Sequence, residues 1–372
     1  MSNWKLLGEF IDECCIKCGG GDVEVSGVDI NKQFISTRAN LDGTDISKYY
    51  VVPKRCFACN LMHIGRDERL PIAYNATGDK IVVTSAYYVF KIKDDKRDEL
   101  LDEFLYIILS SKELDRLTWF YTDSSIRGNL KAARFMDIRI PVPDIKVQRS
   151  VVAAWQGLRE MQAQNERLAA TLMPLCRSYL QDLKHKYKAV EIGEFIEQCD
   201  ERNSDGTYGE DFVRGIATSK ELIATKANLD GVSLTSYKLV KPGEFAYVPD
   251  TSRRGDKISL GRNEENNPVL VSSISCVFRI KGHDQLDPGY LSMLFRRAEF
   301  DRYARFNSWG SAREAFSIAD MRRVKIPLPP MEVQRAIVEV FQAAQSARRT
   351  AERAAALSKG ICPALIQKAI HS

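Results

Sequence analysis

One segment occurs twice in this sequence, at a constant offset of 186 positions. Residues 140–155 read IPVPDIKVQRSVVAAW, and residues 326–341 read IPLPPMEVQRAIVEVF. In both copies, two prolines in extended chain precede a polar turn and then apolar residues at helical spacing. This order is typical of a junction between a globular unit and a helix, so we expect the chain to contain two similar halves.

The remaining matches between the halves predict the elements of each globular unit. Residues 37–43 (TRANLDG) correspond to residues 225–231 (TKANLDG), and Asp-Gly favours a tight turn. Residues 7–14 and 192–199 are expected to begin each unit as a short amphipathic helix. Composition and apolar spacing favour the same strands and helices in both copies. We predict a β-rich run within 50–60 and within 238–249, strands at 80–92 and 137–142 and at 269–280 and 323–328, and helices at 100–117 and 290–303.

A long helix is predicted after each junction. Apolar or neutral residues recur there in alternating steps of three and four, as in a coiled coil. Pro174 and Pro363 interrupt the patterns late, and each is expected to end or kink its helix. The two helices could pack separately on their own units, or they could pair antiparallel, with an Ala-rich seam that permits close approach. The first seam contains Val151, Trp155, Leu158, Gln162, Asn165, Ala169, Leu172, Cys176, Tyr179 and Leu183, and the second contains Val333, Ile337, Val340, Ala344, Ala347, Ala351, Ala354, Ser358, Ile361 and Leu365.

We prefer the antiparallel arrangement, which relates the halves by a pseudo-twofold axis. The predicted fold is α+β, with two tandem α/β domains at residues 1–143 and 188–329. Long helices at residues 144–187 and 330–372 join them as an antiparallel coiled coil. The helix from Gln148 to Met173 would span roughly 39 Å at 1.5 Å per residue. This length is close to one turn of B-DNA, about 34–36 Å.

Composition places few limits on function. The 372 residues suffice for two domains, and the composition is ordinary for a globular protein. The sequence has no apolar run of about 18 residues, and its N-terminus lacks the apolar core of a signal peptide, so we expect a cytoplasmic protein without a membrane span. The net charge of +5 is weak evidence for a partner. Basic clusters such as Arg253-Arg254 suit phosphate, with a solvated mixed-charge surface as the alternative.

The cysteines do not predict a metal site. Nine cysteines, an odd number, argue against a disulfide framework in a cytoplasmic chain. Cys56 and Cys59, with three cysteines at 14–18, could suggest zinc. The second copy, however, has residues 244–247 (EFAY) in place of 56–59 (CFAC), and positions i and i+3 of a strand point to opposite faces. Small buried or unreactive thiols are the preferred interpretation.

Motifs for catalysis and nucleotide binding are missing. An adenine-N6 methyltransferase needs an Asn/Asp-Pro-Pro-aromatic loop, and a motor needs Gly-x-x-x-x-Gly-Lys-Ser/Thr; neither is present. Residues 19–21 (GGG) lie in a polar loop that has no counterpart in the second copy. The histidines His63, His185, His283 and His371 are scattered and lack repeat partners. We therefore predict no catalytic residue and no cofactor site in this chain.

The duplicated Pro-x-Pro and Val-Gln-Arg junction, followed each time by a long helix, resembles the specificity (S) subunit of type I restriction–modification systems. The strand at 242–247 (PGEFAY) and the loop at 310–313 (GSAR) also look like that family's target recognition domains. The resemblance covers nearly the whole chain. The first copy departs from the pattern, with residues 54–56 (KRC) in place of Pro-Gly-Glu and residues 124–127 (SSIR) in place of the Gly-Ser-x-Arg loop.

The resemblance implies a noncatalytic DNA-binding subunit of a phage-defence system. Each recognition domain of such a subunit reads one half of a bipartite site in double-stranded DNA. The long helices bind two copies of a modification subunit, an adenine-N6 methyltransferase that uses S-adenosylmethionine, and restriction (motor and nuclease) subunits can join. The resemblance therefore implies that the cofactor belongs to the methyltransferase partner and not to this chain.

Loops that agree in position but differ in sequence are the best candidates for DNA contacts, because different half-sites require different readers. Lys, Arg and Ser suit phosphate, while Arg and Asn can read base edges. Trp309 could stack on a base, whereas at least one of Tyr87 and Tyr88 is expected in the core. A solvated surface is the alternative for any single residue. The candidates are Arg66, Arg69, Ser124, Ser125, Arg127, Asn129 and Lys131 in the first half, and Ser252, Arg253, Arg254, Lys257, Arg262, Ser308, Trp309, Ser311 and Arg313 in the second.

Two other functions remain open at this point. The chain could be a protein-interaction scaffold whose two domains bind no DNA, and salt-dependent duplex binding would separate that role from DNA recognition. It could also be an enzyme in its own right, which the missing motifs disfavour.

Overall fold

The chain folds into two compact units, each of which includes part of both long helices. Unit 1 comprises Met1–Asn165 with Thr350–Ser372, and unit 2 comprises Glu166–Arg349. The computed structural model describes residues 4–21, 23–37, 40–41, 43–62, 64, 68–123, 128–251, 257–282, 284–310 and 313–371, with side chains up to residue 360.

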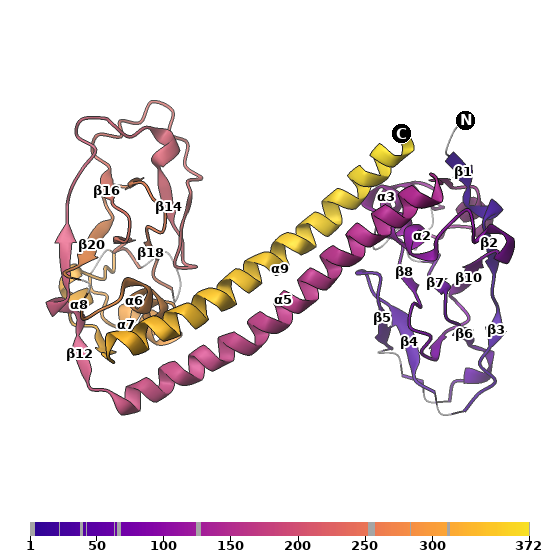
Figure 1. The fold of residues 1–372 in the computed structure, drawn as a ribbon, viewed down its shortest axis with the longest axis horizontal. Helices are drawn as coiled ribbons and strands as arrows, with labels where there is room; N and C mark the ends of the chain where they lie inside the picture. The colour runs from indigo at the N-terminus through magenta and orange to yellow at the C-terminus, as the bar shows by residue number, and fades with distance from the viewer. Residues whose placement is uncertain are drawn as a thin grey trace. The chain divides into compact units, whose positions relative to one another are not determined.

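Unit 1 contains two main sheets. Among the described residues, one has the order β2-β10-β7-β8 and the other the order β3-β6-β9-β4-β5. Helices α2 and α3 lie beside the first part of α5 (Figure 1). The strands are β1 (Trp4–Leu6), β2 (Ile11–Glu13), β3 (Ile16–Lys17), β4 (Val25–Val28), β5 (Phe34–Ser36), β6 (Tyr50–Val52), β7 (Cys56–Cys59), β8 (Ile72–Tyr74), β9 (Ile81–Val83), β10 (Tyr88–Ile92) and β11 (Arg139–Pro141). The helices are η1 (Leu7–Glu9), η2 (Ile46–Lys48), η3 (Asp94–Lys96), α2 (Asp102–Leu109), α3 (Lys112–Phe120), α4 (Ala132–Met136) and the start of α5 (Ile145–Lys186).

Unit 2 repeats the first of these sheets as β13-β20-β17-β18, and its pairs β14-β15 and β16-β19 correspond to β4-β5 and β6-β9 of the second sheet. The strands are β12 (Ala189–Glu191), β13 (Ile196–Cys199), β14 (Arg214–Ile216), β15 (Leu222–Ala224), β16 (Lys238–Val240), β17 (Phe245–Tyr247), β18 (Leu260–Arg262), β19 (Val269–Val271), β20 (Cys276–Ile280) and β21 (Lys325–Pro327). The helices are η4 (Ile192–Glu194), η5 (Glu210–Phe212), α6 (Pro288–Phe295), α7 (Ala298–Phe306), α8 (Ile318–Arg322) and the start of α9 (Met331–His371).

The repeat extends to the packing of single residues. Phe57 on β7 stacks on Phe90 of β10 with ring centroids 5.0 Å apart. Phe245 on β17 stacks on Phe278 of β20 at 5.1 Å. Both pairs are fully buried and lie opposite one another in the antiparallel register. Equivalent strands therefore carry equivalent aromatic cores in the two units.

Several predicted elements are divided in the structure. The single strands predicted at 80–92 and 269–280 were wrong, because each is two strands in different sheets, β9 and β10 or β19 and β20. A turn separates them, closed by Tyr87 N–H to Thr84 O in unit 1 and by Ser275 N–H to Ser272 O in unit 2. The predicted helices at 100–117 and 290–303 likewise divide into α2 and α3 and into α6 and α7.

The predicted amphipathic helix at the start of each unit was also wrong. Residues 7–9 and 192–194 form only a 3-10 turn, and strands β2 and β13 follow at once. Leu7 and Phe10 are buried in the unit 1 core around this turn. The turn is short because Ile11 must pair with Ile92 of the central strand β10.

The two long helices pair antiparallel. Unit 1 holds the first part of α5 and the last part of α9, and unit 2 holds the remaining parts. The predicted seam of α9 is confirmed as far as its side chains are described, because Ala344, Ala347, Ala351 and Ala354 are all buried. Small side chains along a seam allow two helix backbones to approach closely. The remaining seam positions of α9, Ile361 and Leu365, have side chains outside the described residues.

The seam of α5 shifts near its end. The seam follows the prediction as far as Cys176. After that point Leu180 is buried and Tyr179 is exposed, so the prediction that Tyr179 belongs to the seam was wrong. The seam positions Leu172, Cys176 and Leu180 follow one another at two successive intervals of four residues. Such a departure from the alternation of three and four, known as a stutter in coiled coils, rotates the seam around the helix. The shift turns Leu180 and Leu183 into the unit 2 core beside Ile337. Both helices also continue through Pro174 and Pro363, so neither proline ends its helix.

Other sequence expectations concern cysteines and membrane spans. Cys56 packs in a small cluster with Val52 and Val89, whereas Cys59 packs in the main core of unit 1, so the two thiols point to opposite faces of β7 as predicted. Burial raises the pKa of Cys56 to about 12. Within the described chain, no group of ligating side chains suits a metal ion. No described helix combines the length and apolar character that a bilayer crossing requires.

Candidate nucleic-acid interface

The structure brings the two candidate loops of each unit together. The first loop connects β7 to β8 or β17 to β18, and the second follows α3 or α7. In unit 1, the N–H of Leu130 donates to the carbonyl oxygen of Leu61 at 2.8 Å. In unit 2, the N–H of Phe316 donates to the carbonyl oxygen of Pro249 at 2.9 Å. Both units therefore join the same two loops by a backbone hydrogen bond at the same place.

The second loop of unit 2 is a small hairpin. Trp309 and Ala315 exchange backbone hydrogen bonds of 3.2 and 3.0 Å, and the N–H of Thr251 in the first loop donates to Glu314 O at 3.0 Å. Gly310 has φ +144°, and a Cβ there would lie 2.1 Å from Arg313 O, so only glycine fits. The hairpin leaves Arg313 exposed and Trp309 66% exposed. It thus presents a cation and an aromatic ring to solvent, which suits phosphate contact and base stacking.

The described part of the corresponding loop in unit 1 is closed by Asp123 and Asn129. The N–H of Asn129 donates to Asp123 Oδ1 at 3.0 Å, and the N–H of Asp123 donates to Asn129 O at 2.9 Å. The exposed Lys131 follows, immediately before α4. The candidates Ser124, Ser125 and Arg127 lie outside the described residues.

Of the other candidates, Lys257 is exposed, but two side chains are turned away from solvent. Ser308 is buried and donates from Oγ to Ala304 O at 2.6 Å. Arg262 lies within β18, its side chain is only 18% exposed, and it pairs with Glu264 at 3.1 Å. Both residues are therefore occupied within the fold, and we exclude them from the candidate surface. The candidates Arg66, Ser252, Arg253, Arg254 and Ser311 lie outside the described residues.

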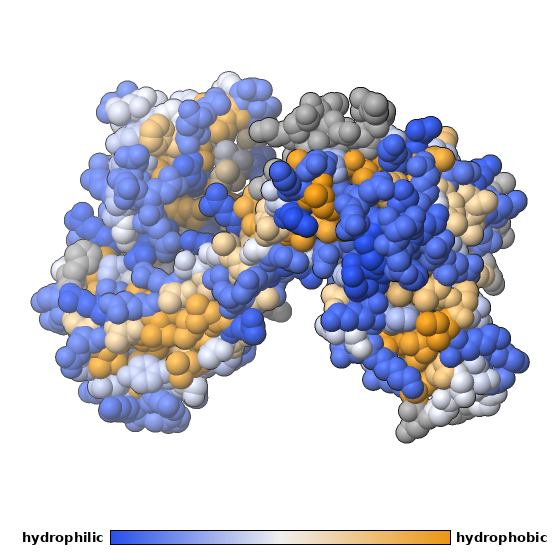
Figure 2. Space-filling model, turned by 45° about the vertical axis from the view of Figure 1, so that its right-hand side comes forward, coloured by the Kyte–Doolittle hydropathy of each residue, from blue (hydrophilic) through white to orange (hydrophobic). Residues whose placement is uncertain are grey.

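A basic hollow of 410 Å³ in unit 1 adds residues that the sequence did not suggest. It contains the predicted Arg69, and it also contains Lys112 of α3, Arg159 of α5 and Lys359 of α9. The Arg159 guanidinium lies 5.6 Å from the ring centre of Trp155. Hydrophilic residues cover much of the face seen in Figure 2. Sequence spacing could not identify the cations of the hollow, because they come from three separate helices.

The corresponding region of unit 2 is smaller and of mixed charge. Its hollow of 180 Å³ is lined by Glu221, Glu264 and Glu265 as well as by arginines. Arg296 occupies the position of Ser110 in the repeat, and its guanidinium donates to the carbonyl oxygens of Ser219 and Lys220 at 3.1 Å. Burial lowers the pKa of Arg296. Among the described residues, the hollow of unit 2 is therefore of mixed charge, whereas that of unit 1 is mainly basic.

The tight turn before β7 or β17 also differs in sequence but not in form. Gly243 has φ +84° in unit 2, and Arg55 adopts φ +65° at the same place in unit 1. Arg55 is held there by Asp102, whose carboxylate side chain is 2% exposed and accepts from Arg55 Nη2 at 2.5 Å. Residues 54–56 therefore depart from the Pro-Gly-Glu pattern in sequence only. The same turn forms, with the ion pair of Arg55 and Asp102 in place of the conformational freedom of glycine.

Comparison with known proteins identifies a family model that matches part of the chain. Residues 262–354 match the family model of the type I restriction modification DNA specificity domain. These residues, which include the second copy of the repeated junction, are similar to that domain. The resemblance expected from the duplicated junction is thereby confirmed, and the function of such a domain is to recognise DNA sequence. No curated protein matches the sequence.

A solved structure of similar fold aligns over nearly the whole chain. The type I restriction–modification S subunit from M. genitalium aligns over 99% of this chain and 96% of that chain, with a TM-score of 0.64 and 12% identity. The HsdS subunit from Thermoanaerobacter tengcongensis aligns over 99% and 96%, with a TM-score of 0.40 and 15% identity. The M. genitalium likeness is one of fold. It covers unit 1 as well as unit 2, and it confirms the predicted α+β fold with two long helices.

Proposed function

We propose that this chain is the noncatalytic DNA-specificity subunit of a type I restriction–modification complex, and that each unit reads one half of a bipartite DNA site. The pair of loops joined at Leu130 and Leu61, and again at Phe316 and Pro249, carries this proposal. The frame around these loops is the same in both units, while the loop sequences differ. A common frame with different loops is what two different half-sites require.

The partners follow from the same reading. The paired helices α5 and α9 would bind two modification subunits, each a methyltransferase that holds S-adenosylmethionine, and restriction subunits would join that complex. The chain itself supplies the phosphate and base contacts. Exposed candidates in the described residues are Arg69, Lys131, Lys257, Trp309 and Arg313, and Asn129 is half-buried. Lys112, Arg159 and Lys359 are exposed around the basic hollow of unit 1.

Salt-dependent DNA binding by the assembled complex tests this function. The chain would be co-purified with its partners from the native host, and duplex affinity would be measured over a series of salt concentrations. Each phosphate contact contributes about −0.9 to the slope of log affinity against log salt. We expect a steep slope together with preferential binding of a defined sequence. Co-purification of other proteins, with no measurable duplex affinity, would instead support a protein-interaction scaffold.

A further inference from the structure

A lysine occupies an unfavourable backbone conformation at the same place in both units. Lys32 lies in the turn between β4 and β5 with φ +64°, and Lys220 lies in the turn between β14 and β15 with φ +68°. Turns of this kind normally place glycine or asparagine there, because a side chain disfavours positive φ. Both residues are also buried, at 6% and 4% exposure. The occurrence of such a strained and buried lysine in both units indicates that its amine has a structural or functional role.

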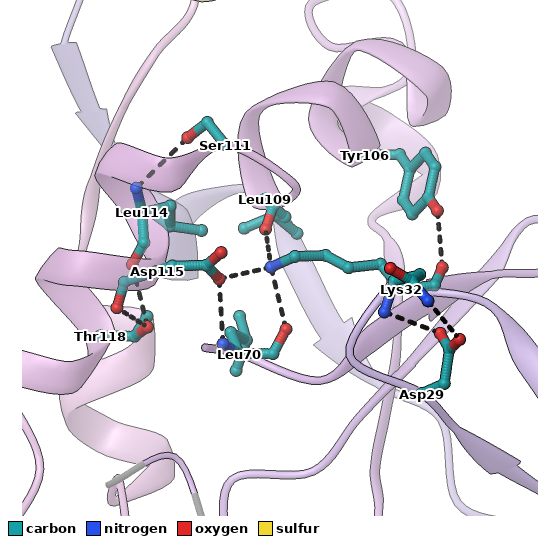
Figure 3. A network of polar contacts seen from close by, with 10 residues as sticks. Asp29, Lys32, Leu70, Tyr106, Leu109, Ser111, Leu114, Asp115 and Thr118 are labelled. Atoms are coloured by element: carbon teal, nitrogen blue, oxygen red, sulfur yellow. Dashed lines mark hydrogen bonds and ion pairs between the residues drawn. The ribbon is translucent and has the colours of Figure 1, made fainter. Parts of the chain in front are cut away.

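In unit 1, the amine of Lys32 joins three segments of the chain (Figure 3). Nζ donates to Leu70 O at 2.9 Å and to Leu109 O at 3.2 Å, and it pairs with Asp115 at 2.5 Å. Asp115 Oδ1 in turn accepts from the N–H of Leu70 at 3.0 Å. The ion pair therefore binds both the N–H and the C=O of one residue, Leu70.

Unit 2 repeats the arrangement. Nζ of Lys220 donates to Ile258 O at 2.6 Å and pairs with Asp301. Asp301 Oδ1 accepts from the N–H of Ile258 at 3.1 Å. We call these two arrangements the Lys–Asp clasps, formed by Lys32 with Asp115 and by Lys220 with Asp301.

The residue that each clasp holds marks the end of a candidate DNA loop. Leu70 directly follows Arg69, and Ile258 directly follows Lys257. Beyond this point the loop returns into the sheet, with Ile72 on β8 and Leu260 on β18. The loop sequences differ between the units, whereas the clasp is the same.

The energetics favour a positioning role over a stabilising one. Burial lowers the pKa of Lys32 and of Lys220, while the facing aspartates oppose that shift. A buried ion pair is often no more stable than a well-packed apolar pair of the same size. An apolar residue or glycine could therefore close either turn, but it could not bind both polar groups of one loop residue.

We propose that the two Lys–Asp clasps are positioning devices for DNA recognition, each fixing the second-last residue of the first candidate loop so that its unit reads one half-site. This inference rests on the proposed function, because it assumes that these loops meet DNA. Each clasp acts through the loop and touches no base itself. Loss of one clasp should therefore impair discrimination at one half-site and leave the other intact.

The test uses the full chain assembled with its modification subunit. The methylated sequence of the native complex is determined first, and methylation rates are then measured on duplexes altered in one half-site or the other. Lys32→Met should reduce discrimination at one half-site by about tenfold, the size of one good base contact. Lys220→Met should do so at the opposite half-site. Arg55→Met is the matched control, because it breaks an ion pair to the buried Asp102 in unit 1 that does not touch Leu70.

The outcomes separate the two proposals. If the native complex methylates no bipartite site, the proposed function fails. If it does, but Lys32→Met behaves like Arg55→Met or both half-sites lose discrimination together, the clasp proposal fails alone. Should Lys32→Met not fold, Asp115→Asn keeps an acceptor for the N–H of Leu70 and weakens the pair. Unchanged discrimination in that folded variant would also overturn the clasp.

Discussion

The side-chain amide of Gln148 donates a hydrogen bond of 2.7 Å to the backbone oxygen of Glu99. The same amide donates to Pro143 O at 2.8 Å, and its oxygen accepts from the N–H of Leu101 at 3.0 Å. Gln148 is fully buried, so these bonds tie the start of α5 to the segment that precedes α2. The glutamine of the repeated Val-Gln-Arg motif thus forms the junction itself.

Replacement of this glutamine should destabilise its unit. In Gln148→Leu the three backbone groups lose their partner, and we expect the free energy of unfolding to fall by about 2–4 kcal/mol, because buried unpaired groups cost about 1–3 kcal/mol each. Chemical denaturation of the purified chain measures the change. Gln156→Leu, on the exposed side of α5, is the control and should have little effect. Equal stability of the two variants would show that the junction does not depend on Gln148.

The same change in the second copy should have the same effect. Gln334 donates to Gln285 O and to Pro329 O at 2.8 Å each and accepts from the N–H of Asp287 at 2.9 Å. We expect Gln334→Leu to destabilise unit 2 by a similar amount, with the exposed Gln342→Leu as its control. The sequence repeat predicted this junction correctly because it depends on local spacing, with Gln148 and Gln334 five residues after a proline carbonyl.

Other features depend on contacts that local spacing does not report. The division of 80–92 into β9 and β10 follows from pairing with strands far along the chain, and β-branched content is the same in either case. The Lys–Asp clasps could not be predicted either, because Lys32 and Asp115 are distant in sequence and each resembles a surface residue. The basic hollow combines residues of three helices for the same reason.

Substitutions in the unit 2 hairpin should weaken DNA binding by the assembled complex. Arg313→Ala removes one exposed cation, so we expect weaker binding and a salt slope smaller in magnitude by about 0.9. Trp309→Ala should cost about 1–3 kcal/mol if the ring stacks on a base. Lys325→Ala, on β21 outside both candidate loops, is the control for charge. If Arg313→Ala and Lys325→Ala have the same slope and affinity as the native chain, the site assignment is wrong.

The basic hollow should contribute to affinity without sequence preference. The double variant Lys112→Ala/Arg159→Ala removes two of its cations, and we expect a salt slope smaller in magnitude by up to about 1.8. Affinity for the preferred and for unrelated duplexes should fall by the same factor, because phosphates carry no sequence information. A loss confined to one sequence would contradict this assignment and would place the hollow at a base.

The buried alanine seam offers a test of the helix pair. Ala347 is 4% exposed, so Ala347→Glu would bury a charge at the seam and should loosen the pairing of α5 and α9. The exposed Ala343→Glu introduces the same side chain four residues earlier and is the matched control. The measurement is the preference for one spacing between the half-sites. If Ala347→Glu keeps that preference as sharp as Ala343→Glu does, the helices do not set the distance.

The central claim is that each unit reads one half of a bipartite site, and mapping methylated adenines in DNA tests it most directly. A host lacking other adenine methyltransferases would express this chain with its modification subunit, once as the native chain and once with the unit 2 hairpin at 309–315 replaced by an unrelated sequence. We predict a methylated motif of two parts separated by a nonspecific spacer, of which only one part changes in the altered chain. A continuous motif, or a change in both parts at once, would contradict the account.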